Sequence, residues 1–279
     1  MTETVASVSV VIPMFNSAAT IERALESVAA QSLLPQEIVV VDDGSDDMGA
    51  SIVKQWNNSN IPVKLVEHSR NIGPAASRNT GWGMAIGTFV AFLDADDSWD
   101  PIKIEIQYKL MFGFPNVVAC GTLHSVNIGE PQAFVSSPQM VPTRQFTVRD
   151  LLIKNRFSTP SVMIRRDINE RFDSAFRYSE DYLLWLNIAS RHMFVHRIEL
   201  PLTILHKNTY GQGGLSGDLL PMLRGELRAI RSTENFTSMT RPRIVLAMMW
   251  SILKFVQRVP RAWCRRLIHK FRTEATINA

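Results

Sequence analysis

The first 110 residues alternate between short apolar runs and segments in which apolar residues recur at helical spacing. Residues 7–12 and 37–41 are rich in β-branched residues and nearly all apolar, which is typical of parallel strands covered on both faces. Between them, Asn16 is the expected N-cap of a helix whose apolar residues follow from Ile21 to Val28. The order strand, helix, strand predicts a βαβ unit.

The same alternation continues with predicted strands at residues 63–67 and 88–93 and a predicted helix at 74–86. It indicates an α/β fold with a mostly parallel sheet flanked by helices. Ligands of such sheets bind at the carboxyl ends of the strands. Two acidic turns, residues 42–43 and 94–97, directly follow predicted strands, so we expect them to face one crevice.

Beyond residue 100 the pattern is looser, and no internal repeat is visible. The predicted elements are a helix at 101–111, strands at 117–125, 159–165 and 194–205, a loop at 129–143, a helix at 180–190, a glycine-rich loop at 211–214 and helices within 218–271. We expect one main domain over residues 1–217, with halves at 1–110 and 111–217. A helical, basic and amphipathic C-terminal region at 218–279 follows it.

Composition places the chain among ordinary globular proteins, since 46% of its 279 residues are hydrophobic and 20% are charged. Disordered, collagen-like and low-complexity chains are excluded. Two distant cysteines, Cys120 and Cys264, cannot build a disulfide framework or a cysteine-based zinc site, which fits a reducing cytoplasm. The first nine residues lack the basic start and apolar run of a signal peptide, so we expect the protein to stay inside the cell.

The net charge of +4 is distributed unevenly along the chain. Residues 241–279 contain nine lysines and arginines and one glutamate, a net charge of +8, whereas the rest of the chain has 21 basic and 25 acidic residues and carries −4. A mildly acidic body with a basic end is not typical of a general nucleic-acid-binding protein. We therefore expect no nucleic acid among the partners.

The turn at residues 94–97 places three carboxylates within four positions. Their mutual repulsion favours a bound divalent cation, and Mg²⁺ or Mn²⁺ on protein carboxylates usually completes its ligand shell with phosphate oxygens. A nucleotide diphosphate would supply those oxygens. The alternative is a solvated acidic turn in which Asp97 or Ser98 caps the next helix.

The turn at residues 42–45 is either part of a ligand-binding crevice or an ordinary tight turn, because Asp and Gly are favoured in any tight turn. Later in the chain, the side chains of Arg70, Arg78 and Asn79 would add hydrogen-bond donors for phosphates and for a base in the same crevice. For Arg78 the alternative is a surface charge on the predicted helix.

Four segments in this order resemble the signature of family 2 glycosyltransferases with the GT-A fold. They read SVVIPMFN at 9–16, VVDDGSDD at 40–47, NIGPAASRN at 71–79 and FLDADD at 92–97. A fifth match, Ser179-Glu180-Asp181, extends the resemblance to about residue 190. The implied fold is a Rossmann-like, mostly parallel sheet flanked by helices with a helical C-terminal appendix, in which 1–110 is the nucleotide-binding half and 111–217 the acceptor half.

By this resemblance, Pro13, Phe15 and Asp43 line the pocket for the base and ribose, and Asp43 accepts a hydrogen bond from the base. Arg78 reaches the base or the diphosphate. The implied donor is a nucleotide diphosphate sugar. UDP-sugars are the commonest donors in the family, and guanosine and deoxythymidine donors also occur.

The segment Asp94-Ala95-Asp96 is similar to the DxD motif of the family, in which Asp96 contacts ribose and metal. Asp97 is implied as the closer metal ligand, and the ion as Mn²⁺ or Mg²⁺. His206, a further candidate metal ligand, precedes the glycine-rich loop at 211–214. A comparable histidine and loop often close over the diphosphate in this family, although the alternative for a lone histidine is a structural role.

The resemblance also implies a general base, Asp181. It would take the proton from an acceptor hydroxyl as that oxygen attacks the anomeric carbon opposite the leaving nucleoside diphosphate, which inverts the anomeric configuration. The alternative for Glu180 and Asp181 is a helix start, where acids are stabilised by the helix dipole. Trp185 would either stack on a sugar ring or pack in the core.

Near the C-terminus, residues 244–250 are apolar, but basic residues interrupt the run before the roughly 20 residues needed to span a bilayer. Four basic residues share one helical face: Lys254, Arg258, Arg261 and Arg265. This pattern favours a helix lying on an anionic membrane surface. The alternative is that the apolar face packs on the domain and the arginines are solvated.

We therefore expect an inverting glycosyltransferase with a glycan or lipid-linked acceptor, acting in bacterial surface polysaccharide assembly. It would be cytoplasmic and, if the basic helix binds lipid, peripheral on the inner face of the cell membrane. The chain lacks the Q-x-x-R-W motif of processive synthases, which favours transfer of one sugar or few. No G-x-G-x-x-G follows the first strand, which disfavours a nicotinamide-dependent oxidoreductase. The competing hypothesis is a catalytically silent nucleotide-sugar-binding scaffold at the membrane.

Overall fold

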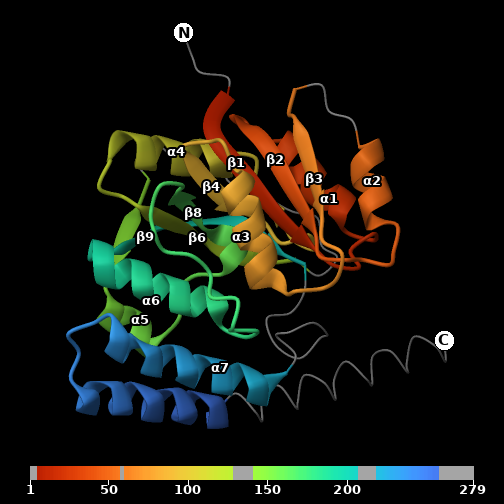
Figure 1. Ribbon diagram of the computed structural model, residues 1–279. Helices are drawn as coiled ribbons and strands as arrows, with labels where there is room; N and C mark the ends of the chain where they lie inside the picture. The colour runs from red at the N-terminus through yellow and green to blue at the C-terminus, as the bar shows by residue number, and fades with distance from the viewer. Residues whose placement is uncertain (1–4, 57–59, 128–140, 207–217, 258–279) are drawn as a thin grey trace, which may run out of the picture.

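A mixed sheet runs through the molecule, and helices cover both of its faces (Figure 1). The computed structural model describes residues 5–56, 60–127, 141–206 and 218–257, and within these ranges the sheet has nine strands. They are β1 (Val5–Met14), β2 (Leu34–Asp42), β3 (Val63–Glu67), β4 (Phe89–Phe92), β5 (Ser98–Trp99), β6 (Ala119–Val126), β7 (Thr143–Phe146), β8 (Met163–Arg165) and β9 (Val195–Leu205). Their order is β3-β2-β1-β4-β8-β6-β9-β5, with β7 paired to β9. The predicted α/β class is confirmed.

The neighbouring strands β3, β2, β1 and β4 are all parallel, as the βαβ pattern predicts. Beyond β4 the directions are mixed: β8 is antiparallel to both β4 and β6, whereas β6 and β9 are parallel. The parallel arrangement therefore holds for the first half of the chain. It places the carboxyl ends of β1, β2 and β4 at one edge of the sheet.

The two faces of the sheet bury two separate cores. The helices are α1 (Ile21–Ala29), α2 (Gly49–Gln55), α3 (Pro74–Met84), α4 (Lys103–Gly113), α5 (Val148–Ile153), α6 (Glu180–His192) and α7 (Leu219–Ser232), with 3-10 turns η1 (Thr159–Ser161) and η3 (Thr233–Asn235). Because successive strand residues point to opposite faces, Val10 shares a core with α1 and α4, and Val11 shares the other with α3 and α6. Trp185 is fully buried in this second core, so stacking on a sugar is wrong and its core alternative is confirmed.

The second predicted half of the domain, residues 111–217, departs from prediction in two places. The strand predicted at 159–165 begins only at Met163, because Pro160 cannot donate a ladder hydrogen bond and the chain forms η1 instead. The elements β7 and α5 do not follow from the alternation pattern. The start of α5 nevertheless has a local signal, since Thr147 and Asp150 form a capping box.

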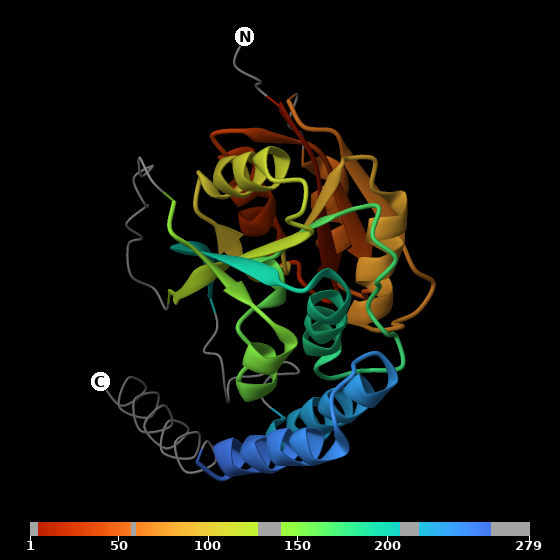
Figure 2. The same ribbon diagram turned by 90° about the vertical axis from the view of Figure 1, so that its left-hand side faces the viewer.

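Two helices lie side by side at the end of the molecule opposite the amino terminus (Figures 1 and 2). They are α7 and a helix at residues 241–257, which we call the C-terminal helix. Ile230 of α7 and Ile244 of the C-terminal helix are buried in the second core. Within the described ranges, no helix combines the length and the apolar character needed to cross a membrane. Of the predicted basic stripe only Lys254 is described, because its other three residues lie beyond residue 257.

Candidate functional site

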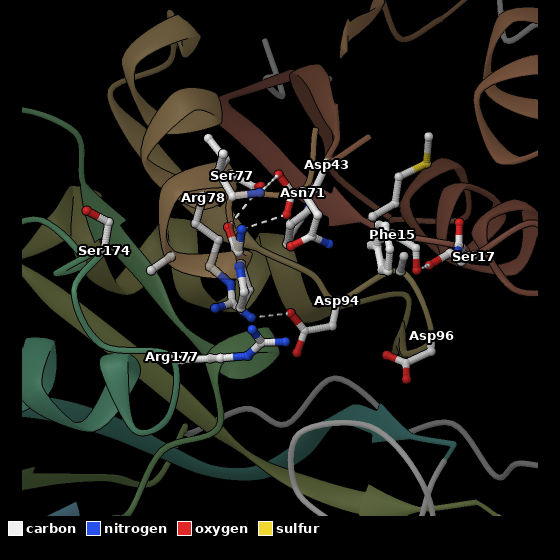
Figure 3. A pocket seen from close by; sticks show the side chains of 18 of the residues that line it. Phe15, Ser17, Asp43, Asn71, Ser77, Arg78, Asp94, Asp96, Ser174 and Arg177 are labelled. Carbon is white, nitrogen blue, oxygen red and sulfur yellow. Dashed lines mark hydrogen bonds and ion pairs between the residues drawn. The ribbon is translucent and has the colours of Figure 1, made fainter. Parts of the chain in front are cut away.

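A cavity of about 890 Å³ opens at the carboxyl ends of β1, β2 and β4 (Figure 3). Its walls come from the turn after β1, the loop before α3, the acidic turn after β4 and the segment before α6. Six of the predicted site residues line it: Pro13, Phe15, Asp43, Arg78, Asp94 and Asp96. The volume is in the range of pockets that bind small molecules. The structure thus brings the two acidic turns to one crevice.

The turns after β1 and β2 are fixed to each other. The backbone N–H of Asn16 donates to Ser45 Oγ at 2.9 Å. Asn16 has a left-handed φ of 49° and, contrary to prediction, does not cap α1, whose N-cap residue is Thr20. Gly44 has a φ of 74°, and a Cβ there would lie 2.7 Å from the backbone carbonyl carbon of Arg70. The turn at residues 42–45 therefore requires glycine at this position.

Asp43 is almost completely buried and organises the loop that leads into α3. Its Oδ1 accepts a hydrogen bond from the N–H of Ile72 at 3.0 Å and lies 2.9 Å from His68 Nδ1. Its Oδ2 accepts from the N–H of Gly73 at 2.8 Å. The same carboxylate lines the cavity, so Asp43 both shapes the wall and borders the space for a ligand.

Arg78 connects the two halves of the site from the buried side of α3. Its Nη2 donates to Asp94 Oδ1, a pair drawn in Figure 3, and its Nη1 donates to Glu180 Oε1, both at 2.8 Å. Burial lowers the pKa of Arg78, but the two carboxylates outweigh burial and the net shift is upward. Arg78 is therefore a charged bridge inside the protein, and the alternative of a surface charge is wrong.

Asp181 lies in the first turn of α6. The residue two positions earlier, Ser179, has a left-handed φ of 60°, which turns the chain sharply into the helix. Asp181 Oδ1 accepts from the N–H of Tyr182 at 2.6 Å, and its Oδ2 accepts from the Thr159 hydroxyl at 3.5 Å. The carboxylate is thus held from two sides, by its own helix and by η1.

The pKa of Asp181 is affected by the same residues that form the Arg78 bridge. Burial, and then the charge of Glu180, raise the pKa of Asp181 to about 7, while Asp94 adds to the rise and Arg78 opposes it. Glu180 and Asp181 do begin a helix, but Glu180 also pairs with Arg78, and the charges of Arg78 and Asp94 act on Asp181. Asp181 itself is not among the residues that line the cavity. A carboxylate whose pKa lies near 7 is suited to accept a proton at neutral pH.

The three residues predicted as metal ligands are Asp96, Asp97 and His206. A hydrogen bond links Asp97 and His206, but the three side chains are not grouped around one metal position. Asp96 lines the cavity, whereas Asp97 is nearly buried and its Oδ1 accepts from the backbone N–H of His206 at 3.2 Å. The Nε2 of His206 lies 2.8 Å from Ser98 Oγ, and Ser98 belongs to β5 rather than capping a helix. In the described part of the chain, no group of three or more His, Cys, Asp or Glu side chains is arranged to hold a metal ion.

The charges of the acidic turn nevertheless suit a cation. Burial, and then the charges of Asp94 and Asp96, raise the pKa of Asp97 to about 8. Burial and the two neighbouring carboxylates therefore both disfavour the ionised form of Asp97, and a hard divalent ion would offset them. Burial also lowers the pKa of His206, which keeps its ring in the neutral form that binds metals.

One cavity residue that the sequence analysis did not single out is Arg177. It is exposed and extends its guanidinium group into the cavity (Figure 3). It precedes the first residue of α6 by three positions and shares no helical spacing with Asp181, so no local pattern marks it as a cavity residue. Conversely, two predicted hydrogen-bond donors do not line the cavity: Arg70 is exposed outside it, and the amide of Asn79 donates to the backbone carbonyl of Phe172 at 2.7 Å.

Comparison with known proteins supports the motif-based resemblance. The model of the family described as "Glycosyl transferase family 2" matches residues 9–172, more than half of the chain. The chain is similar to the UDP-Glc:alpha-D-GlcNAc-diphosphoundecaprenol beta-1,3-glucosyltransferase WfgD of Escherichia coli, with 31% identity over 181 residues that cover 65% of this chain and 69% of that protein. Some other curated relatives are longer, and the chain spans only 30% of their length.

Two solved structures share the fold. TarS 1–349 of S. aureus in complex with UDP-GlcNAc has a TM-score of 0.63 and 20% identity over 86% of this chain and 70% of that one. The mannosyltransferase PcManGT from Pyrobaculum calidifontis, in complex with GDP-Man and Mn²⁺, has a TM-score of 0.62 and 19% identity over 97% of this chain and 83% of that one. The predicted GT-A fold is confirmed.

Proposed function

The chain belongs to glycosyl transferase family 2, and from this we propose that it moves a sugar from a nucleotide diphosphate sugar to an acceptor hydroxyl with inversion at the anomeric carbon. One observation carries the proposal: the buried bridge through Arg78 joins the acidic turn at the cavity to the helix that bears Asp181. In this proposal residues 1–110 bind the nucleotide, residues 111–217 bind the acceptor, and 218–279 form the C-terminal region.

The donor would bind with its nucleotide between Phe15 and the loop held by Asp43. Phe15 offers an exposed aromatic ring and Pro13 a rigid edge, whereas Arg78 and Arg177 offer positive charge for the diphosphate. A UDP-sugar is the proposed donor class, because the name of WfgD specifies UDP-Glc and the TarS complex holds UDP-GlcNAc. The GDP-Man in PcManGT defines the competing class.

Asp181 is the proposed general base. Its carboxylate would take the proton of the acceptor hydroxyl while that oxygen forms a bond to the anomeric carbon and the bond from that carbon to the donor phosphate oxygen breaks. The electron pair of the broken bond leaves with the nucleoside diphosphate. The Thr159 hydroxyl, 3.5 Å from Asp181 Oδ2, would hold the carboxylate in place during the transfer.

A divalent ion, Mn²⁺ or Mg²⁺, is part of the proposal, and PcManGT was solved with Mn²⁺. Asp96 and Asp97 would hold it through oxygen ligands, with His206 as a further candidate. When bound, the ion would offset negative charge on the leaving diphosphate. The raised pKa of Asp97 supports this role, because burial and the charges of Asp94 and Asp96 disfavour its ionised form, which a bound cation would stabilise.

The proposed acceptor is a glycan or a lipid-linked sugar at the inner face of the bacterial membrane. The support is the name of WfgD, whose acceptor is a diphosphoundecaprenol-linked sugar. Transfer of a single sugar, rather than processive synthesis, completes the proposal. The competing function is a silent scaffold that binds nucleotide sugars without transfer.

Replacing Asp181 with Asn tests the proposal. We expect kcat to fall by about 10² to 10⁴-fold, because the amide cannot accept the proton, while the dissociation constant for the donor stays unchanged. The assay is acceptor-dependent release of nucleoside diphosphate from a panel of UDP-, GDP- and dTDP-sugars, with donor binding followed by calorimetry. The control is Asp167→Asn, whose side chain is 72% exposed on the surface.

Wild-type kcat in Asp181→Asn would contradict the base assignment. Donor binding by the wild-type protein without transfer from any sugar of the panel would favour the scaffold. Equal loss of kcat in both variants would show that the measurement follows folding rather than chemistry.

A further inference from the structure

The C-terminal helix has apolar side chains on both of its sides. Ile244, Ala247 and Met248 pack on the second core. The opposite side carries large apolar residues that are 44% to 63% exposed, and we call them the outer face: Val245, Leu246, Met249, Trp250, Ile252, Leu253 and Val256. A helix that is apolar all round is stable where its surroundings are apolar on all sides, and the residues that the structure describes cover only one side of this helix.

Side-chain contacts fix the direction of the outer face. Trp250 Nε1 donates to the backbone carbonyl of Ile153 at 3.1 Å, and Lys254 Nζ donates to the same carbonyl at 3.0 Å. Lys254 also forms an ion pair with Glu226 of α7 at 3.0 Å. Ile153 is itself 54% exposed and extends the apolar surface. The helix is thus anchored on the body, and its outer face is held toward the surroundings.

The basic residues that precede and follow the outer face in the sequence identify its occupant. Arg241 and Arg243 are exposed at the start of the helix, and residues 258–279 contain six lysines and arginines and one acid. A symmetric dimer through the outer face would bring two such sets of positive charge together, which costs affinity. A surface with an apolar interior and negative headgroups matches both features at once.

We infer that the outer face docks on an anionic lipid bilayer and lies in its headgroup region without crossing it. This inference rests on the proposed function in one respect, namely that a lipid-linked acceptor would then meet the cavity from the membrane side. The geometry agrees. Both α7 and the C-terminal helix lie at the end of the molecule opposite the amino terminus (Figure 1). β1 runs toward this end, and the cavity opens at its carboxyl end.

Contacts of α7 connect the docking helix to the cavity wall. The guanidinium group of Arg228 lies 4.2 Å from the centre of the Phe176 ring and donates to the backbone carbonyl of Ala175 at 3.2 Å. The hydroxyl of Tyr178 donates to Asp218 at 3.1 Å. Since Phe176 lines the cavity, the membrane-facing pair of helices directly supports the wall of the site.

Co-sedimentation of the full chain with vesicles tests the inference. The vesicles are phosphatidylcholine alone and phosphatidylcholine mixed with phosphatidylglycerol, and the variant, called here the double variant, is Leu246→Glu with Leu253→Glu. The matched control is Phe112→Glu with Phe114→Glu, which adds the same two negative charges at apolar residues that are 65% and 62% exposed. They lie in and directly after α4, and α4 is at the other end of the molecule from the C-terminal helix (Figure 1). Wild type and control should bind the anionic vesicles, and the double variant should bind at least about tenfold more weakly.

Unchanged binding by the double variant, or no binding of wild type to either vesicle, would overturn the inference. It would also be overturned if size-exclusion chromatography showed a wild-type dimer that the double variant dissociates, because the outer face would then be a self-association surface. Transfer to a short water-soluble acceptor should be equal in wild type and double variant. That measurement separates failure of docking from failure of the proposed function, and matching thermal unfolding curves confirm that the variant is folded.

Discussion

The two walls of the cavity are held by different kinds of interaction. The turns after β1 and β2 form the wall that we propose for the donor, called here the donor wall. Backbone groups dominate it, since the carboxylate of Asp43 accepts from two backbone N–H groups and Gly44 makes a close approach to the next loop. The segment before α6 and the start of α6 form the wall that we propose for the acceptor, called here the acceptor wall. Side chains reach it from α3: Arg78 binds Glu180, and Asn79 binds the backbone of Phe172. The donor wall is therefore set by local geometry, whereas the acceptor wall depends on α3.

Breaking the link between the walls should have the largest effect. Arg78→Met leaves Glu180 buried without its partner and removes the ion pair of Asp94. Loss of one member of a buried ion network costs about 3 to 5 kcal/mol, and we expect the lower end, because the Asp94 side chain is 29% exposed. Urea unfolding measures this change, and the KM for the donor should rise as well.

A surface pair provides the control for this prediction. Arg165 lies 3.3 Å from Asp167, whose side chain is 72% exposed, so Arg165→Met should cost less than about 1 kcal/mol. If both arginine variants lose equally little stability, the bridge does not hold the two walls together. The comparison between the walls would then fail.

The donor wall could be predicted from sequence because its chemistry follows strand ends. Once residues 37–41 and 88–93 are recognised as parallel strands, Asp43 and Asp94 must lie at one edge of the sheet. No comparable rule predicts the acceptor wall, because its residues do not follow the ends of parallel strands. Arg78 and Glu180 are 102 positions apart, and their contact depends on how α6 packs against α3. Only the family resemblance pointed to Asp181, and nothing in the pattern singled out Arg177.

The burial of Lys103 in the core is a second feature that could not be predicted from the local sequence. A lysine near the start of a predicted helix is expected at the surface. Instead it is fully buried, with Nζ 2.6 Å from Gln107 Oε1 and 3.9 Å from the centre of the Trp99 ring. Burial lowers its pKa to about 7. Its position depends on tertiary packing against Trp99, which no local pattern encodes.

The packing of α3 on the sheet sharpens the comparison, because α3 serves both walls. A Cβ at Gly81 would lie 2.4 Å from Val11 Cγ1 of the central strand, so Gly81→Ala should destabilise the protein by about 1 to 3 kcal/mol. Gly83 has no atom within 4 Å of such a Cβ, and Gly83→Ala should stabilise by up to about 1 kcal/mol. Thermal unfolding of the two variants gives the comparison, and equal changes would contradict the close contact.

The pH dependence of kcat examines the acceptor wall alone. Asp181 must be ionised to accept a proton, and its pKa is raised to about 7, so kcat should fall about tenfold per pH unit below that value. Glu180→Gln removes the like charge and frees Arg78 to face Asp181. Both changes lower the pKa, and the acid limb should move to lower pH. Glu170→Gln is the control, because Glu170 pairs with Arg191 at the other end of α6.

The same shift has a consequence for stability with a defined sign. Because the pKa of Asp181 is higher in the folded protein than its ordinary value of 3.8, its protonated form favours folding, and this contribution is lost as the pH rises through about 7. Asp181→Asn should therefore be more stable than wild type above pH 7 and similar to it near pH 4. Two results together would contradict this account. The acid limb of the kcat profile would be the same in Glu180→Gln and wild type, and Asp181→Asn would be as stable as wild type both near pH 4 and above pH 7. The acceptor wall would then not raise the pKa of Asp181.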